Sequence, residues 1–160
     1  MRYKLCLTGL ESVGKTSFAN RVANNSFSEK YKSTIGVKIF NHIYSENEEY
    51  IIWDIEGGSS TISSNPTYFR GSNAYLIVCD VTNQESIDSI EHFHNIVHDS
   101  YYATPIFLLF NKVDLEFNRE KIELKMQEFP LTNSYYISCK TNIGIQAILN
   151  GISQRLYSNK

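Results

Sequence analysis

The sequence predicts a doubly wound α/β fold, in which helices cover both faces of a mostly parallel sheet. Strand-like and helix-like runs alternate along the chain. Residues 74–79 (AYLIVC) and 106–110 (IFLLF) are continuous apolar runs, which is the pattern of strands buried on both faces. Folds of this class bind ligands at the carboxyl ends of their strands. Function is therefore expected in the loops that follow the strands.

The first half of the chain contains a predicted strand, a helix and a hairpin. The apolar run Tyr3–Thr8 predicts a strand that ends just before a glycine. Lys15–Asn24 has the apolar spacing of a helix. The β-rich segments Val37–Tyr44 and Tyr50–Ile55 are separated by a short polar stretch, which predicts an antiparallel hairpin. The apolar face of the helix consists of Phe18, Ala19 and Val22.

The second half contains two further helices and a short strand. Thr82 and Glu85 have the spacing of a capping box, which predicts that a helix begins here. A last short strand is predicted at Tyr135–Ser138, followed by an amphipathic closing helix. The residues expected to face the core from these two helices are Ile87, Ile90, Val97, Ile145, Ile148, Leu149, Ile152 and Leu156.

Length and composition exclude several classes of protein. The 160 residues suit one compact unit, so residues 1–160 are interpreted as a single domain. A net charge of −2 gives no electrostatic reason to expect a nucleic acid or an anionic membrane as partner. No apolar run is long enough to span a bilayer, and the start of the chain has no signal-peptide pattern. We expect a monomer in the cytoplasm.

Residues 9–16, G-L-E-S-V-G-K-T, form a complete phosphate-binding loop between a strand and a helix. The glycines let successive backbone N–H groups point at phosphate oxygens, an effect reinforced by the helix N-terminus. Lys15 is expected on the β- and γ-phosphates, and the Thr16 hydroxyl on Mg²⁺. The alternative is a chance match in a glycine turn. The residues expected to contact nucleotide here are Glu11, Ser12, Val13, Gly14, Lys15, Thr16 and Ser17.

Residues 111–114, N-K-V-D, directly follow the apolar run IFLLF. With the phosphate loop, this tetrapeptide resembles the small GTPases of the Ras superfamily, which bind GTP and GDP. The Asp114 carboxylate would accept two hydrogen bonds from the N1–H and 2-amino edge of guanine, which adenine cannot supply, so an ATP-using enzyme is disfavoured. By resemblance, Asn111 would brace the neighbouring loops and the Lys112 stem would cover one face of the base. Taken alone, N-K-V-D also fits a surface turn, but its position downstream of a phosphate loop favours the guanine site.

Two further segments resemble parts of the same family. Ser138-Cys139-Lys140 resembles its S-A-K loop, whose backbone N–H meets guanine O6, with Cys139 in place of the usual alanine. Phe27 lies where the family has an aromatic ring edge-on to the base. Ordinary core packing is the alternative for Phe27.

Two segments resemble the switches of this superfamily. Residues 33–37, S-T-I-G-V, resemble the first switch of Rab proteins, and residues 54–57 carry the pattern D-x-x-G. The resemblance implies that Thr34 reaches Mg²⁺ and the γ-phosphate only when GTP is bound. Asp54 would hold Mg²⁺ through water, and the Gly57 N–H would sense the γ-phosphate. Such segments order and disorder with the nucleotide, and they would bind effectors and exchange factors.

The Rab branch is indicated by three segments: S-T-I-G-V, Y-F-R-G-S at 68–72 and C-D-V-T at 79–82. The resemblance covers nearly the whole chain. It implies the GTPase form of the doubly wound fold, with a six-stranded, mostly parallel sheet, one antiparallel strand and about five helices. It also implies a role in vesicle traffic.

Departures from the family cluster around the γ-phosphate. Gly58 stands where the family has the glutamine that orients the attacking water. Glu56 replaces a small residue, and Glu11 adds bulk where an arginine finger, worth roughly 10³–10⁵ in rate, would enter. If both carboxylates point inward, they disfavour GTP relative to GDP. The residues assigned to catalysis are Lys15, Thr34, Gly57 and, as a hypothetical water-positioning group, Glu56.

These departures predict slow GTP hydrolysis, and they leave two interpretations open. The first is a GTP/GDP switch that hydrolyses slowly. The second is a non-hydrolysing GTP/GDP-binding scaffold, a pseudo-GTPase. Intact Mg²⁺ contacts favour the first, whereas Gly58, Glu56 and Glu11 favour the second.

The regulatory surfaces and the end of the chain also differ from the Rab pattern. Residues 58–66 are serine-rich and end in Pro66, which predicts a poor helix in the second switch. Of the aromatic triad that Rab effectors use, Trp53 and Tyr68 remain, but Ile39 replaces phenylalanine. Standard Rab effectors and exchange factors are therefore expected to fail. The sequence as given ends at Lys160 without a terminal cysteine, so we expect no prenylated membrane anchor unless a native tail is missing from it.

Two sets of potential metal ligands have simpler explanations. His94 and His98 have the i, i+4 spacing that can bind a metal, with His92 nearby, but a solvated helix face is the commoner cause. The cysteines match no zinc spacing, so we expect reduced and mostly buried thiols. They are Cys6, Cys79 and Cys139.

Overall fold

The computed structural model describes residues 1–30, 32–57, 65–101 and 103–158. Within these ranges six strands form one sheet, in the order β2-β3-β1-β4-β5-β6. β2 and β3 pair antiparallel, and the other neighbours pair parallel. The strands are β1 (Arg2–Thr8), β2 (Val37–Ser45), β3 (Glu48–Ile55), β4 (Ala74–Asp80), β5 (Ile106–Asn111) and β6 (Asn133–Tyr136). The predicted fold class is confirmed.

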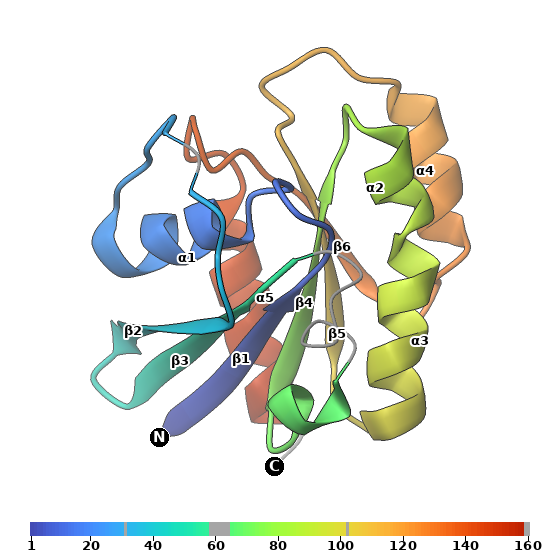
Figure 1. Ribbon diagram of the computed structural model, residues 1–160. Helices are drawn as coiled ribbons and strands as arrows, with labels where there is room; N and C mark the ends of the chain where they lie inside the picture. The colour runs from blue at the N-terminus through green and yellow to red at the C-terminus, as the bar shows by residue number, and fades with distance from the viewer. Residues whose placement is uncertain (31, 58–64, 102, 159–160) are drawn as a thin grey trace.

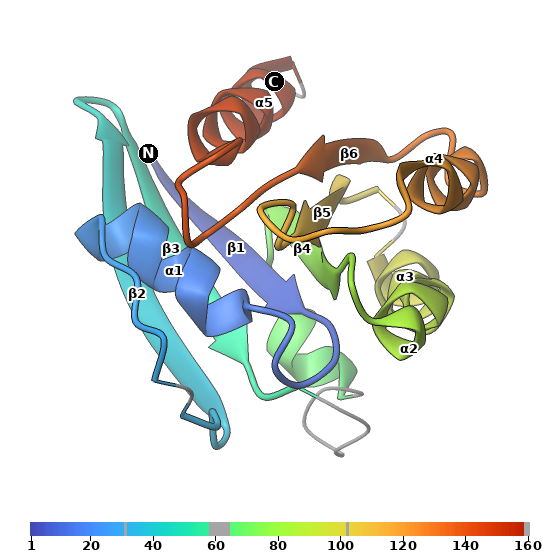
Figure 2. The same cartoon turned by 90° about the horizontal axis from the view of Figure 1, so that it is seen from above.

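Helices cover both faces of this sheet. Figures 1 and 2 show α1 and α5 on one face and α2, α3 and α4 on the other. None of the helices in the described ranges is long and apolar enough to cross a membrane. The helices are α1 (Lys15–Asn24), α2 (Gln84–Asp88), α3 (Ile90–Tyr101), α4 (Arg119–Gln127) and α5 (Ile145–Ser158), with a short 3₁₀ helix at Pro66–Phe69.

The core has two halves, one on each face of the sheet. Successive strand residues point to opposite faces, so Leu5 and Leu7 of β1 pack into one cluster while Cys6 packs into the other. Phe18 of α1 belongs to the first cluster, and Phe93 of α3 belongs to the second. This two-sided burial explains why β4 and β5 are apolar without alternation.

The strand order places the carboxyl ends of β1, β4 and β5 side by side. β1 lies between β3 and β4, and the chain continues from β1 to one side of the sheet and then to the other. Such a reversal is the position where doubly wound sheets bind ligands. The loops after these strands are the phosphate loop, the segment after Asp80 and the N-K-V-D segment.

Several predicted boundaries were wrong. Asn83, and not Thr82, caps α2, because the Asn83 side chain accepts the Ser86 N–H while Thr82 bonds to Asp80. The helix predicted from Thr82 is also two helices, which meet at Ser89. The Ser89 hydroxyl bonds the Ser86 carbonyl there, in competition with the helical ladder.

The last strand and the hairpin also differ from the prediction. β6 ends at Tyr136 rather than Ser138, because Ser138 leaves the sheet to form an isolated bridge with Ile143. The hairpin turn is shorter than expected, since β3 already begins at Glu48. The remaining strands and α1 agree with the prediction to within one or two residues.

Candidate nucleotide-binding site

A cleft of about 870 Å³ opens over the carboxyl ends of the central strands, which is within the usual size of a small-molecule site. Segments far apart in the sequence line it. They are the phosphate loop, the segment after α1, the start of β2, the end of β3, and the loops after β5 and β6. Of the predicted site residues, those lining the cleft are Glu11, Ser12, Gly14, Lys15, Thr16, Ser17, Phe27, Thr34, Glu56, Gly57, Asn111, Lys112, Asp114, Cys139 and Lys140.

Three predicted residues lie behind the cleft wall. The Val13 side chain packs in the core, with 2% of its surface exposed, so only its backbone is available to the site. Ser138 and Asp54 are fully buried and act through their neighbours. Gly58 lies outside the described residues, together with most of the predicted second switch.

The phosphate loop can contain only glycine at two positions. Gly9 and Gly14 have φ angles of 138° and 107°, which other residues rarely adopt. A Cβ on Gly14 would also lie 2.1 Å from the Asn111 side-chain nitrogen, and one on Gly9 would lie 2.3 Å from the Val78 carbonyl oxygen. Gly14 is the N-cap of α1 and makes no side-chain capping bond. A helix N-terminus without such a cap favours a bound anion.

Lys15 is a buried cation that lacks an acidic partner within hydrogen-bonding distance among the described residues. Its Nζ donates to the carbonyl oxygens of Gly9, at 3.0 Å, and Leu10, at 2.6 Å. Burial lowers the pKa of Lys15 to about 8, an effect that the charges of Asp54 and Glu11 oppose. An anion in the cleft would offset this desolvation, because it would stabilise the charged ammonium.

Three oxygen-bearing side chains meet next to Lys15. The Thr16 hydroxyl donates to Asp54 Oδ2 at 2.5 Å, and the Thr34 hydroxyl lies 2.9 Å from Thr16 Oγ1 and 3.3 Å from Asp54 Oδ2. Burial raises the pKa of Asp54, although hydrogen bonds from Thr16 and Lys15's charge oppose the shift. Asp54 Oδ1 is buried and has no hydrogen-bond partner among the described residues.

This cluster fits a magnesium ion. Hydroxyl and carboxylate oxygens are the ligands Mg²⁺ prefers, and the orphaned Asp54 Oδ1 is the kind of atom that a cation, directly or through its water, would satisfy. Lys15 favours a bound anion and Asp54 favours a bound cation. The two sites are adjacent, as a metal–phosphate pair requires.

The base side of the cleft is braced by Asn111. Its amide nitrogen donates to the Val13 carbonyl at 2.9 Å, and its amide oxygen accepts the Cys139 N–H at 3.2 Å. Asn111 therefore joins the loop after β5 to the phosphate loop and to the loop after β6, as predicted. This second bond occupies the Cys139 N–H. If the same N–H also contacts guanine O6, as the resemblance to the S-A-K loop implies, Asn111 and the base would share that donor.

Asp114 is exposed at the mouth of the cleft, where Ser138 orients it. The buried Ser138 hydroxyl donates to Asp114 Oδ1 at 2.6 Å and accepts the Thr141 N–H at 3.1 Å. Phe27 lines the cleft and also packs against the core, so both interpretations of Phe27 hold geometrically.

Sequence reasoning missed Arg21 and the partner of Lys140. Arg21 of α1 donates to the carbonyl oxygens of Cys139, at 2.9 Å, and Lys140, at 3.0 Å, and so supports the loop after β6. Lys140 forms an exposed ion pair with Glu29 at 2.9 Å. No local pattern signals these contacts, because their partners are about 110 or more positions apart in the chain.

Glu56 contacts the first switch. Its carboxylate accepts the Gly36 N–H at 2.9 Å, and its own N–H donates to the Gly36 carbonyl at 2.8 Å. Gly57 lies against the phosphate loop, since a Cβ there would lie 2.4 Å from Lys15 Nζ. The end of β3 therefore touches both the first switch and the phosphate loop.

The histidines and cysteines named above lie in different surroundings. No group of three or more His, Cys, Asp or Glu residues in the described part of the chain could hold a metal ion. His94 and His98 stack on each other, with ring centroids 5.5 Å apart. All three cysteines are buried thiols, and burial raises the pKa of each.

Several known proteins are similar to this chain in sequence. Residues 4–114 match the family described as "Ras of Complex, Roc, domain of DAPkinase". Ras-related protein Rab-7L1 of Rattus norvegicus is 30% identical over 169 residues, covering 98% of this chain and 83% of that protein. RabJ of Dictyostelium discoideum is 30% identical over 167 residues, covering 100% of this chain and 65% of that protein.

Rab-3C of Bos taurus is 32% identical over 121 residues, which cover 73% of this chain and 53% of that protein. The chain thus spans about half the length of Rab-3C and most of Rab-7L1. The resemblance read from the motifs is confirmed. The chain belongs to the Roc/Ras-type GTPases, which are guanine-nucleotide-binding domains, and its relatives include Rab proteins.

Proposed function

We propose that residues 1–160 form a single, monomeric domain that switches between GTP- and GDP-bound states with Mg²⁺ and hydrolyses GTP slowly. The observation that carries the proposal is the convergence in one cleft of three parts. These are the phosphate loop with the buried Lys15, the oxygen cluster of Thr16, Thr34 and Asp54, and Asp114 at the far end. Each part suits a different portion of Mg²⁺–GTP.

The proposed chemistry is the attack of water on the γ-phosphorus. The bond between that phosphorus and the bridging β–γ oxygen breaks, GDP leaves, and inorganic phosphate forms. Lys15 and the phosphate-loop N–H groups neutralise the charge that develops on the phosphate oxygens. Mg²⁺, held by Thr16, Thr34 and Asp54, would supply further charge neutralisation. Thr34 and Gly57 would report the γ-phosphate to the two switches.

Slow hydrolysis follows from the residues around the γ-phosphate. Gly58 offers no side chain to orient water. Glu56 is already engaged with the Gly36 N–H, so its role as a water-positioning group requires its second carboxylate oxygen or a rearrangement. This contact favours the second candidate function, a non-hydrolysing GTP/GDP-binding scaffold.

The partners and the location of the protein are proposed from its family resemblance. Effectors and exchange factors would bind the switches, where Ile35 and Ile39 present 85% and 57% of their surface to solvent. From the resemblance to the Rab family, we propose a cytoplasmic role in vesicle traffic. Ile39 in place of an aromatic residue would select partners other than standard Rab effectors.

A single-turnover measurement of GTP hydrolysis with saturating Mg²⁺ tests the proposal. We expect a measurable rate no faster than about 10⁻⁴ s⁻¹, the order found for an unassisted small GTPase. A rate equal to that in buffer, with GTP still bound, would favour the scaffold. Failure to retain either GTP or GDP would overturn both functions.

A further inference from the structure

Asp80 carries a buried carboxylate at the edge of the sheet where the nucleotide-binding loops begin. It has no role in the proposed chemistry. It is the last residue of β4, and 6% of its surface is exposed. β4 lies between β1, which leads into the phosphate loop, and β5, which leads into N-K-V-D. Asp80 is paired with Asn111 in the sheet register, so it sits beside both nucleotide-binding loops.

The two oxygens of this carboxylate have different partners. Oδ1 accepts the Thr82 N–H at 2.9 Å and the Thr82 hydroxyl at 2.7 Å, which fixes the orientation of the group. Oδ2 is thereby directed at Lys112, whose Nζ lies 2.5 Å away. A buried carboxylate with a fixed rotamer is a rigid anchor for a long, flexible side chain.

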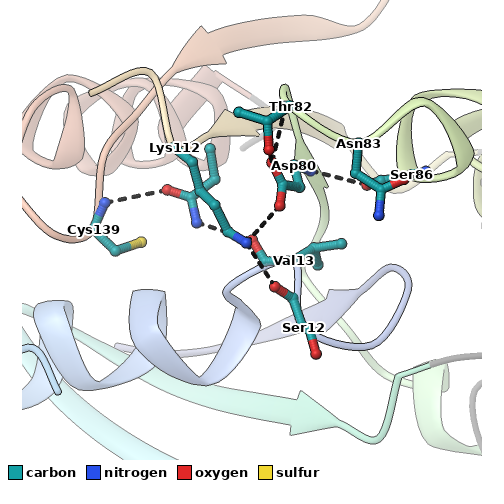
Figure 3. Close-up of polar contacts among 9 residues, drawn as sticks. Ser12, Val13, Asp80, Thr82, Asn83, Ser86, Lys112 and Cys139 are labelled. Atoms are coloured by element: carbon teal, nitrogen blue, oxygen red, sulfur yellow. Dashed lines mark hydrogen bonds and ion pairs between the residues drawn. The ribbon is translucent and has the colours of Figure 1, made fainter. Parts of the chain in front are cut away.

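Lys112 connects this anchor to the phosphate loop. Its Nζ also donates to the Ser12 carbonyl at 3.0 Å, so the ammonium group lies between β4 and the phosphate loop (Figure 3). One third of the Lys112 side chain remains exposed, and Lys112 lines the cleft. The head of the lysine is therefore fixed while part of its stem stays available to a ligand.

Both ends of this connection have an unfavourable backbone conformation. Lys112 has a φ angle of 72°, and Ser12 has one of 64°. A residue with a Cβ adopts such angles at a cost, and it keeps them only where surrounding contacts hold it there. The ion pair to Asp80 and the bond to Ser12 are contacts of that kind.

We propose that Asp80 is a positioning residue for guanine-nucleotide binding: by holding Lys112 against the phosphate loop, it keeps the lysine stem in place over the base. This inference rests on the proposed nucleotide binding and adds to it a residue that touches no ligand. Without the carboxylate, the ammonium group would keep only the Ser12 carbonyl and would sample other rotamers. The base would then lose one wall of its site.

The test compares release rates of the fluorescent nucleotide mant-GDP in excess Mg²⁺. Asp80→Asn keeps the shape of the side chain and removes its charge. We expect release about tenfold faster, since a hydrogen bond between charged groups is lost at a partly buried site. Glu49→Gln is the matched control, because it removes the carboxylate of an exposed ion pair, Arg2–Glu49, outside the site. It should release at the wild-type rate.

A structural effect is separated from a positioning effect by the Lys112→Ala background. If Asp80 acts through Lys112, then Asp80→Asn adds nothing to Lys112→Ala, and the double variant releases no faster than Lys112→Ala alone. The acceleration of release on chelating Mg²⁺ should also stay at its wild-type factor, because the Asp80 carboxylate bonds to Thr82 and Lys112 and not to the Thr16 cluster in the described part of the chain. A full additional tenfold in the double variant would overturn the inference, as would Asp80→Asn with wild-type release.

A second variant covers the case in which Asp80→Asn does not fold. Thr82→Val removes the hydroxyl, which makes the shorter of the two Thr82 hydrogen bonds that orient Asp80, and leaves the carboxylate charged. We expect faster release in the wild-type background and no change in the Lys112→Ala background. Equal release in the former, or faster release in the latter, would overturn the inference. A wild-type protein that retains no mant-GDP would instead overturn the proposed function, and this assignment with it.

Discussion

The two ends of the cleft are built differently. At the base end, Asn111, Ser138 and Cys139 are almost fully buried, and side chains join three loops to one another. At the γ-phosphate end, the first switch is largely exposed, with 85% of the Ile35 surface open to solvent. Its contacts to the rest of the site include the Thr34 hydroxyl bonds and the Gly36–Glu56 pair.

We interpret this difference in burial as a division of roles, with recognition of the base at one end of the cleft and the nucleotide-dependent switch at the other. A site that must select guanine gains from rigid, pre-oriented groups, because leaving such groups unpaired penalises the wrong base. A segment that must respond to one phosphate gains from low local stability, because a few bonds then decide its conformation. The departures predicted from the sequence, Glu11, Glu56 and Gly58, are assigned to the second end, whereas Cys139 is the departure predicted at the base end.

The largest effect is expected at the base end. Asp114→Ala should weaken GDP binding by about 10⁴-fold, because the guanine edge loses its acceptor and the Ser138 hydroxyl loses its partner. Competition of unlabelled GDP with mant-GDP measures this loss. Glu116→Ala, two residues away and also exposed, is the control and should bind normally. Tight binding by Asp114→Ala would mean that the base is recognised elsewhere.

Substitution in the oxygen cluster that is proposed to hold Mg²⁺ should have a smaller effect than the loss of Asp114. Thr16→Ala removes an oxygen from the proposed Mg²⁺ site, and Mg²⁺ affinity should fall by roughly 10–100-fold. The measurement is GDP release in excess Mg²⁺ and again after chelation. Wild type should show a large ratio between the two rates, whereas the variant should show a ratio close to one. A preserved ratio would place the metal away from Thr16.

The contact between Glu56 and Gly36 can be tested at the γ-phosphate end of the cleft. Glu56→Ala removes the acceptor of the Gly36 N–H, and exchange of that amide hydrogen should accelerate by about tenfold. Glu46→Ala, in the exposed hairpin turn, is the control. GTP hydrolysis by the same variant decides the role of the carboxylate. A rate equal to wild type would exclude Glu56 as the group that positions water.

The smallest effect is expected at Cys139. Its thiol is buried, but the site uses its backbone N–H, so Cys139→Ala should change mant-GDP release by less than about twofold. Thermal unfolding should show a loss of about 1 kcal/mol from the lost packing. Release tenfold faster would show that the thiol itself supports the base.

Some of the site could be predicted because its signals are local. The phosphate loop and N-K-V-D each occupy consecutive positions, and their conformations depend on glycines and on nearby strand ends. Asp80 stands out in the sequence only as part of a Rab-like segment, because its partner Lys112 follows a different strand and meets it only when β4 and β5 pair. The orientation of Glu56 toward Gly36 is likewise a contact between segments twenty positions apart.

The fold class could be predicted from the sequence alone, because continuous apolar runs mark strands that are buried on both faces. A nucleotide ligand could be predicted as well, because the phosphate loop has few alternative conformations. The predictions for the cap of α2 and the end of β6 were wrong, because serine, threonine and asparagine side chains compete there with the backbone for hydrogen bonds. Which charged side chains meet depends on the tertiary structure. Lys112 reaches Asp80 because the parallel pairing of β4 and β5 brings the ends of these two strands to one edge.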